Sequence, residues 1–126
     1  MKDSLKTQVG GSHYMNMMVQ PIEFIVNAKL TFIQGNIIKY ISRYKYKNGA
    51  QDINKCIHYA KLAIDLDSKN ESVCSNIAVG LAYSYCKANN LSSAQTDIIV
   101  ATTFDDYNKV KRLCNLLLKK EYPNLY

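Results

Sequence analysis

An apolar side chain returns every three or four positions along residues 33–44, and this period constrains the fold more than any other feature of the sequence. The residues are Ile33, Ile37, Ile41 and Tyr44. Residues at this spacing share one face of an α-helix, whereas a half-buried strand would alternate with a period of two. We therefore predict an amphipathic helix over about 33–48. It should end at Asn48-Gly49, because glycine readily adopts the left-handed conformation that terminates helices.

Similar helical periods continue through the rest of the chain, and no segment alternates convincingly enough to be a strand. A partner helix over about 50–68, with Ile64 and Leu66 on its buried face, would complete a helical hairpin. Pro21 should open a short helix before the hairpin, with Ile22 on its buried side, because the first helical position needs no backbone N–H. Three further helices are expected at about 72–89, 93–103 and 106–121.

The C-terminal helices carry more specific signals. Ile77 belongs to an apolar stripe of the first of them, and Gly80 there suggests close packing against a neighbouring helix. Ser92 and Gln95 fit a capping box, in which two residues exchange hydrogen bonds at the start of a helix. Asp105 is expected to cap the last helix. The predicted fold is therefore all-α: a hairpin core with a short N-terminal helix and three C-terminal helices.

Size and composition suggest one compact unit with two parts. The hairpin falls within residues 1–69, and residues 70–126 would form a helical extension that serves either in oligomerisation or as a lid. No apolar run approaches the roughly 20 residues of a membrane span, and the first residues lack the apolar core of a signal peptide. We therefore expect a cytoplasmic protein with no membrane partner.

The cysteines predict neither a metal site nor a disulfide framework. They are widely spaced, form no CxxC motif and are accompanied by only 2 histidines. Each lies beside apolar residues of an expected helix, as is usual for small, reduced core residues. The four are Cys56, Cys74, Cys86 and Cys114.

Positive charge is concentrated in one part of the chain. Of the net charge of +6, residues 36–61 carry +5. On the helix expected at 33–48 a polar stripe lies beside the apolar one, and it consists of Asn36, Lys39, Arg43 and Lys47. Lysine and arginine bind phosphate, and the tyrosines between them can stack on a flat ligand. So compact a patch suits a small phosphorylated molecule better than a nucleic acid, and a merely solvated face is the alternative interpretation.

Three segments together resemble a family of small phage proteins, the phage nucleotide kinases. They are VGGSHY at 9–14, QPIEFI at 20–25 and GNIIKYISRYKYKNGAQDINK at 35–55. The resemblance covers about residues 9–66. It implies a phage-encoded nucleotide-binding protein of an infected bacterial cell that transfers phosphate from ATP to (deoxy)nucleoside monophosphates. The ligand site that it implies consists of His13, Tyr14, Gln20, Glu23, Asn36, Lys39, Tyr40, Arg43, Lys45, Lys47, Asn48, Asp52 and Lys55.

Whether the chain is an enzyme stays open at this point. Most kinases hold phosphates with a GxxxxGK[ST] loop and magnesium, and this chain has no such loop. It shows no carboxylate pair placed to bind magnesium. A kinase of this composition would use ATP, with or without magnesium, and would bring no resident cofactor. Its catalytic candidates are His13, Glu23 and Asp52.

Two other functions draw on the same residues. The first is a non-catalytic, homo-oligomeric protein that sequesters cyclic nucleotide or cyclic ADP-ribose-type immune signals, an anti-defence role. Oligomers are expected because several apolar stripes on a short chain leave faces to cover. The second, less favoured function is a nucleic-acid-binding module that uses Lys45, Lys47 and the C-terminal lysines. It predicts a steep dependence of affinity on salt.

Overall fold

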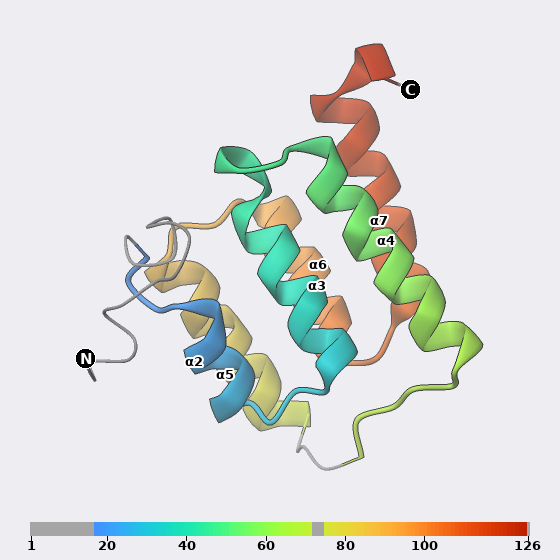
Figure 1. Ribbon diagram of the computed structural model, residues 1–126. Helices are drawn as coiled ribbons and strands as arrows, with labels where there is room; N and C mark the ends of the chain where they lie inside the picture. Colours follow the sequence, from blue (N-terminus) through green and yellow to red (C-terminus); the bar gives the residue numbers. More distant parts are fainter. Residues whose placement is uncertain (1–16, 72–74, 126) are drawn as a thin grey trace.

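The computed structural model describes residues 17–71 and 75–125, and every regular element of this part is helical (Figure 1). This confirms the predicted all-α class, with a short first helix, a hairpin and three C-terminal helices. None of the helices within these residues is long and apolar enough to cross a membrane. The elements are α2 (Pro21–Asn27), α3 (Phe32–Arg43), a 3-10 turn (Tyr44–Tyr46), α4 (Ala50–Asp65), α5 (Ser75–Ala88), α6 (Ser93–Thr103), α7 (Tyr107–Glu121) and a second 3-10 turn (Pro123–Leu125).

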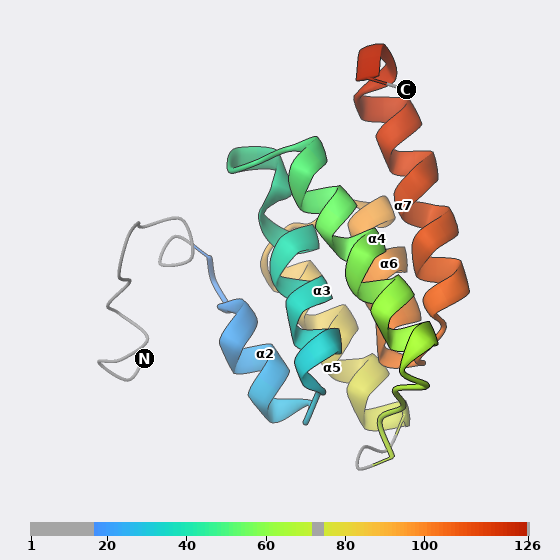
Figure 2. The same ribbon diagram turned by 45° about the vertical axis from the view of Figure 1, so that its right-hand side comes forward.

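The helices form two layers that face each other. One layer consists of α2, α3 and α4, and the other of α5, α6 and α7, as both ribbon views show (Figures 1 and 2). Across the interface α2 contacts α5, α3 contacts α6, and α4 contacts α7. Within the layers α3 packs on α2 and α4, and α6 packs on α5 and α7. The helices after residue 70 therefore complete the same core that the hairpin begins.

A single core cluster joins the two layers. Ile37 and Ile41 of α3, both fully buried, belong to it, as the helical period predicted. Tyr44 is also buried, and its hydroxyl donates to Glu121 Oε2 at 2.7 Å. Three predicted core cysteines, Cys56, Cys86 and Cys114, are buried free thiols; Cys74 lies outside the described residues.

Capping boxes fix the starts of α3 and α6. The predicted capping box of Ser92 and Gln95 is confirmed, and an unpredicted one joins Thr31 and Gln34 at the start of α3. Both glutamines also reach into the core: Gln34 Nε2 donates to the Thr102 carbonyl, and Gln95 Nε2 donates to the Ile41 carbonyl. Each capping box thus ties α3 to α6.

Three residues on predicted apolar faces are exposed in the structure: Ile22, Ile64 and Ile77. On α5 the buried face runs through Ala78 and Ala82, so Ile77, one position earlier, is 62% exposed. On α4 Ala63 is buried, but the next residue, Ile64, is 41% exposed, and on α2 Ile22 is 51% exposed. Neighbouring residues of a helix point about 100° apart, so the residue beside a buried position can face solvent. The predicted burial of Ile22 and Ile64 is therefore wrong, as is that of Ile77.

Helix ends, a cap and a glycine correct further predictions. Helix α3 ends at Arg43, where a 3-10 turn follows, rather than at Asn48-Gly49. Helix α4 ends at Asp65, so Leu66 leaves the helix and is exposed. A Cβ at Gly80 would meet no atom within 4 Å, so this glycine does not mark close packing. Asp106 caps α7 by accepting from the Lys109 N–H, whereas Asp105 accepts hydrogen bonds from residues elsewhere in the fold. The donors to Asp105 are Gln34 Nε2, the Asn70 N–H and the Tyr107 hydroxyl.

A candidate anion site on α3 and α4

Tyr40 is the centre of a cluster of cationic side chains on the joined faces of α3 and α4. Lys39 Nζ lies 5.1 Å from the centroid of its ring, Arg43 Cζ 4.7 Å and Lys55 Nζ 4.8 Å. Cations are attracted to the negative face of an aromatic ring at such distances. We call these four residues the Tyr40 cluster. Helical spacing explains part of the grouping, because Tyr40 and Arg43 are three residues apart on α3, and Lys55 reaches the ring from α4.

The sequence placed Arg43 on an exposed polar stripe, but in the structure its side chain is buried and paired. Only 6% of the residue is exposed, and its Nε and one terminal nitrogen donate to the two carboxylate oxygens of Asp52, each at 3.2 Å. The reason is that α3 ends at this residue, so the side chain lies between α3 and the start of α4. Asp52 also accepts from the Asn48 N–H at 3.3 Å, which fixes the turn between the helices. A fully buried, paired carboxylate is poorly placed to contact a ligand.

Positive charge exceeds negative charge around Lys39. Burial is the main reason that the pKa of Lys39 lies below its ordinary value of 10.5. Neighbouring cations lower that pKa further: Arg43, Lys47 and Lys55. Among the described residues, the carboxylate of Asp52 acts in the opposite direction, and it is already paired with Arg43. Within the part of the chain that the structure describes, Lys39 and Lys55 form no ion pair. An anion bound here would relieve the repulsion between these cations.

A row of aromatic rings leads away from the cluster. The Tyr40 and Tyr59 rings stack with centroids 6.0 Å apart, and Phe32 meets Tyr59 edge-on at 6.4 Å. Phe32 precedes the helix predicted at about 33–48 and was not among the predicted site residues. Phe32, Asn36 and Tyr40 follow one another at intervals of four residues. This spacing puts all three on one face of α3 and could have identified Phe32 from the sequence.

A shallow hollow of about 230 Å³ adjoins this row. It lies between the end of α2 and the start of α3, and Gly35 forms part of its lining. A Cβ at Gly35 would come within 3.1 Å of Ile25 Cγ2, so this glycine lets α2 approach α3. Lys39 belongs both to the hollow and to the Tyr40 cluster. The residues that line the hollow are Ile25, Leu30, Thr31, Phe32, Gly35, Asn36 and Lys39.

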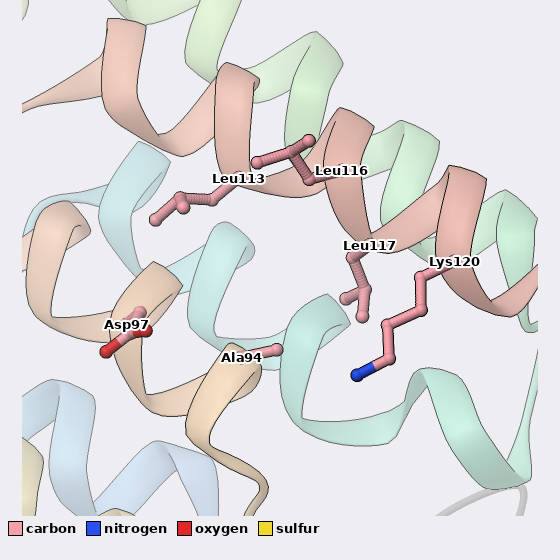
Figure 3. Close-up of a pocket in the computed structure, with 6 residues that line it drawn as sticks. All are labelled: Ala94, Asp97, Leu113, Leu116, Leu117 and Lys120. Atoms are coloured by element: carbon pink, nitrogen blue, oxygen red, sulfur yellow. The ribbon is translucent and has the colours of Figure 1, made fainter.

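A second hollow, of about 200 Å³, lies on the other layer between α6 and α7 (Figure 3). Its lining is mainly apolar, with Leu113, Leu116 and Leu117 from α7. Asp97 and Lys120 are its charged residues, one of each sign, at opposite ends of the hollow. This hollow lacks the excess positive charge of the Tyr40 cluster.

The structure is that of one chain, so the predicted homo-oligomer stays a prediction.

The other predicted site residues are spread around the cluster. Lys45, Lys47 and Asn48 are exposed in the turn between α3 and α4. Gln20 is buried before α2, and Glu23 is half-buried in the first turn of that helix. His13 and Tyr14 lie outside the described residues. Asn36 is half-buried, and its amide donates to the Phe32 carbonyl at 2.9 Å. The members that the structure brings into direct contact are Lys39, Tyr40, Arg43, Asp52 and Lys55.

Comparisons with known proteins correct the family resemblance. A family model described as a protein of unknown function, DUF3310, matches residues 9–61. No curated protein and no solved structure gives a significant match. Among the residues that the structure covers, no group of three or more histidine, cysteine, aspartate or glutamate side chains could hold a metal ion. The resemblance to phage nucleotide kinases is therefore wrong, because the matching family has no known function and nothing indicates the kinases. Over α2, α3 and most of α4, the chain is similar to a family of unknown function.

Proposed function

We propose that this protein binds a small phosphorylated molecule of the nucleotide type at the Tyr40 cluster and does not transform it. The observation that carries the proposal is the convergence of Lys39, Arg43 and Lys55 on one half-buried tyrosine ring. Arg43 is the member whose charge is offset by a paired carboxylate. Two ammonium groups thus remain available to bind an anion.

Phosphate is the anion that matches this arrangement best. Its oxygens can accept hydrogen bonds from several ammonium groups at once, and charge-assisted hydrogen bonds of this kind are stronger than neutral ones. The lowered pKa of Lys39 supports the same view, because it reflects burial and nearby cations that a bound anion would compensate. The aromatic row beside the cluster favours a ligand that also carries a flat group.

Binding without turnover is the simpler use of these residues. Phosphoryl transfer requires two phosphate-bearing groups held in line and neutralisation of the developing charge. The sequence contains no phosphate-binding loop of the GxxxxGK[ST] type. Asp52, one of the expected catalytic candidates, is 0% exposed and occupied by Arg43. As part of this proposal we place the protein in the cytoplasm, where nucleotides are abundant.

Calorimetry with a defined panel of ligands tests the proposal. The panel contains AMP, ADP, ATP, a cyclic dinucleotide and inorganic pyrophosphate, each with and without magnesium, followed by chromatography of the ligand released on denaturation. We expect at least one ligand to bind and to be recovered unchanged. Lys39→Gln and Lys55→Gln should each weaken that binding by about 10-fold or more, as the loss of a charge-assisted contact does.

The matched control is Lys87→Gln, which removes an exposed lysine of α5. It should leave the affinity unchanged. Binding that is equally sensitive to all three substitutions would reflect net charge rather than a site. Recovery of a phosphorylated or cleaved product would exclude a pure binder, and the absence of binding across the panel would reject the proposal.

A further inference from the structure

We infer that the hollow between α2 and α3 is a subsite for the aromatic base of the bound molecule, with the base stacked on Phe32. This inference rests on the proposed function, because it assumes that the phosphate lies at the Tyr40 cluster. It adds that the ligand carries a planar heteroaromatic base as well as its phosphate. A sugar phosphate or pyrophosphate, which has no base, would leave the hollow empty.

The backbone at Phe32 is anchored by hydrogen bonds of its neighbours, although 78% of the residue is exposed. It is the first residue of α3, directly after the cap Thr31. Thr31 Oγ1 accepts from the Gln34 N–H at 3.2 Å, and the Thr31 N–H donates to Gln34 Oε1 at 2.9 Å. Gln34 is fully buried and bonded to the Thr102 carbonyl. The exposed ring is attached to a backbone that is already ordered. Binding a ligand there would therefore cost little further backbone entropy.

The surroundings of Phe32 suit a base. Its ring already contacts Tyr59 edge-on, in line with the stacked Tyr59 and Tyr40. Ile25 and Leu30 supply apolar walls to the hollow beside it. Bases stack on aromatic side chains irrespective of their identity, because every base has a π-face. The apolar walls would cover the part of the base that the ring leaves open.

Lys39 connects the hollow with the Tyr40 cluster. It lines the hollow, and its Nζ lies over the Tyr40 ring. Side chains of a helix lean toward its N-terminus, so Lys39 extends toward Asn36, which also lines the hollow. The side-chain Nδ2 of Asn36 already donates to the Phe32 carbonyl. This leaves the side-chain Oδ1 of Asn36 to accept a hydrogen bond from the edge of a base.

The size of the hollow agrees with a partial rather than a complete ligand. At about 230 Å³ it is smaller than the roughly 300–1,000 Å³ of pockets that hold whole drug-sized molecules. A base would fill it, and the sugar would pass along Lys39 toward the cations of the cluster. Recognition would thus be divided between two adjoining parts of the α3 face.

Comparing ligands with and without a base tests this inference. The ligands are the 5′-monophosphates of adenosine, guanosine, cytidine and uridine, and ribose 5-phosphate, titrated to millimolar concentration against the full chain and followed by NMR chemical shifts. We expect at least one monophosphate to bind about 10-fold more tightly than ribose 5-phosphate, the size of one stacking contact. Phe32→Ala should abolish this difference and leave the affinity for ribose 5-phosphate unchanged.

Controls separate this inference from the proposed function. Phe104→Ala removes another exposed phenylalanine, 53% exposed after α6, and should change neither affinity. Lys55→Gln should weaken all five ligands alike. Equal binding of ribose 5-phosphate and the monophosphates, unaffected by Phe32→Ala, would overturn the base subsite and leave the phosphate site intact. Binding of none of the five would overturn both. A change of sedimentation mass with Phe32→Ala, without a change in affinity, would identify Phe32 as a protein contact instead.

Discussion

Arg43 is the residue at which the fold and the candidate site meet. Its guanidinium pairs with Asp52 and lies over Tyr40. Removing one partner of a buried ion pair leaves an uncompensated charge, which usually costs about 3–5 kcal/mol. We therefore expect Asp52→Ala to lower the free energy of unfolding by about that amount in urea denaturation. Asp65→Ala, at the exposed end of α4, is the control and should change stability by less than about 1 kcal/mol. A similarly small effect of Asp52→Ala would contradict the pairing.

Lys39 gives the site a pH dependence with a defined sign. Because burial and nearby cations lower its pKa below 10.5, Lys39 loses its proton earlier than an ordinary lysine as the pH rises. Anion affinity should therefore decline with rising pH before 10.5 is reached. In Lys39→Arg, whose guanidinium stays protonated, this early decline should disappear. Titrations of a bound nucleotide at several pH values check this, and an identical pH profile for both proteins would exclude Lys39 from the site.

The lowered pKa of Lys39 also makes stability depend on pH, but with the opposite sign: stability rises with pH where anion affinity falls. The folded-state pKa of Lys39 lies below its unfolded value, so the unfolded chain binds more protons in the interval between the two. Stability therefore rises with pH across that interval. Without ligand, protonation of Lys39 is therefore less favourable in the folded than in the unfolded protein.

At the scale of single helices, the two interior glycines have different roles. Gly35 lies against Ile25, whereas a Cβ at Gly80 would meet no atom within 4 Å. Because alanine is the better helix former by about 1 kcal/mol, Gly80→Ala should raise the free energy of unfolding by roughly 0.5–1 kcal/mol. Gly35→Ala should gain less or lose stability, because Ile25 must move. Urea denaturation of both variants measures the contrast, and a destabilising Gly80→Ala would mean that α5 packs more closely than described.

These glycines also show where sequence reasoning succeeds and where it fails. Helical periods, Pro21 and the capping box of Ser92 depend on local chemistry, and all three located their helices within a few residues. Whether Gly80 packs closely, or whether Ile77 rather than Ala78 is buried, depends on the helix that lies opposite. The sequence likewise predicted the basic stripe, but the pairing of Arg43 with Asp52 needed the geometry of the turn between α3 and α4.

At the scale of the whole molecule, the candidate site depends on helices outside the segment that matches a known family. That segment, residues 9–61, contains α2, α3 and most of α4. Helices α6 and α7 pack on α3 and α4 and supply Ile98, Ile99 and Val110 to the common core. The packing therefore favours one folding unit over a hairpin domain with an appended extension.

A fragment experiment tests this unity. A chain of residues 1–71 would expose the core faces of α3 and α4, and cores of about 70 residues or fewer rarely supply more than about 3–5 kcal/mol even when complete. We expect this fragment to show weak helical circular dichroism and no cooperative unfolding. Mixing it with a fragment of residues 72–126 should restore helical signal, since the two layers bury each other's apolar faces. Cooperative unfolding of residues 1–71 alone would instead establish the hairpin as a domain, and the C-terminal helices would then be free to act as a lid or an oligomerisation element.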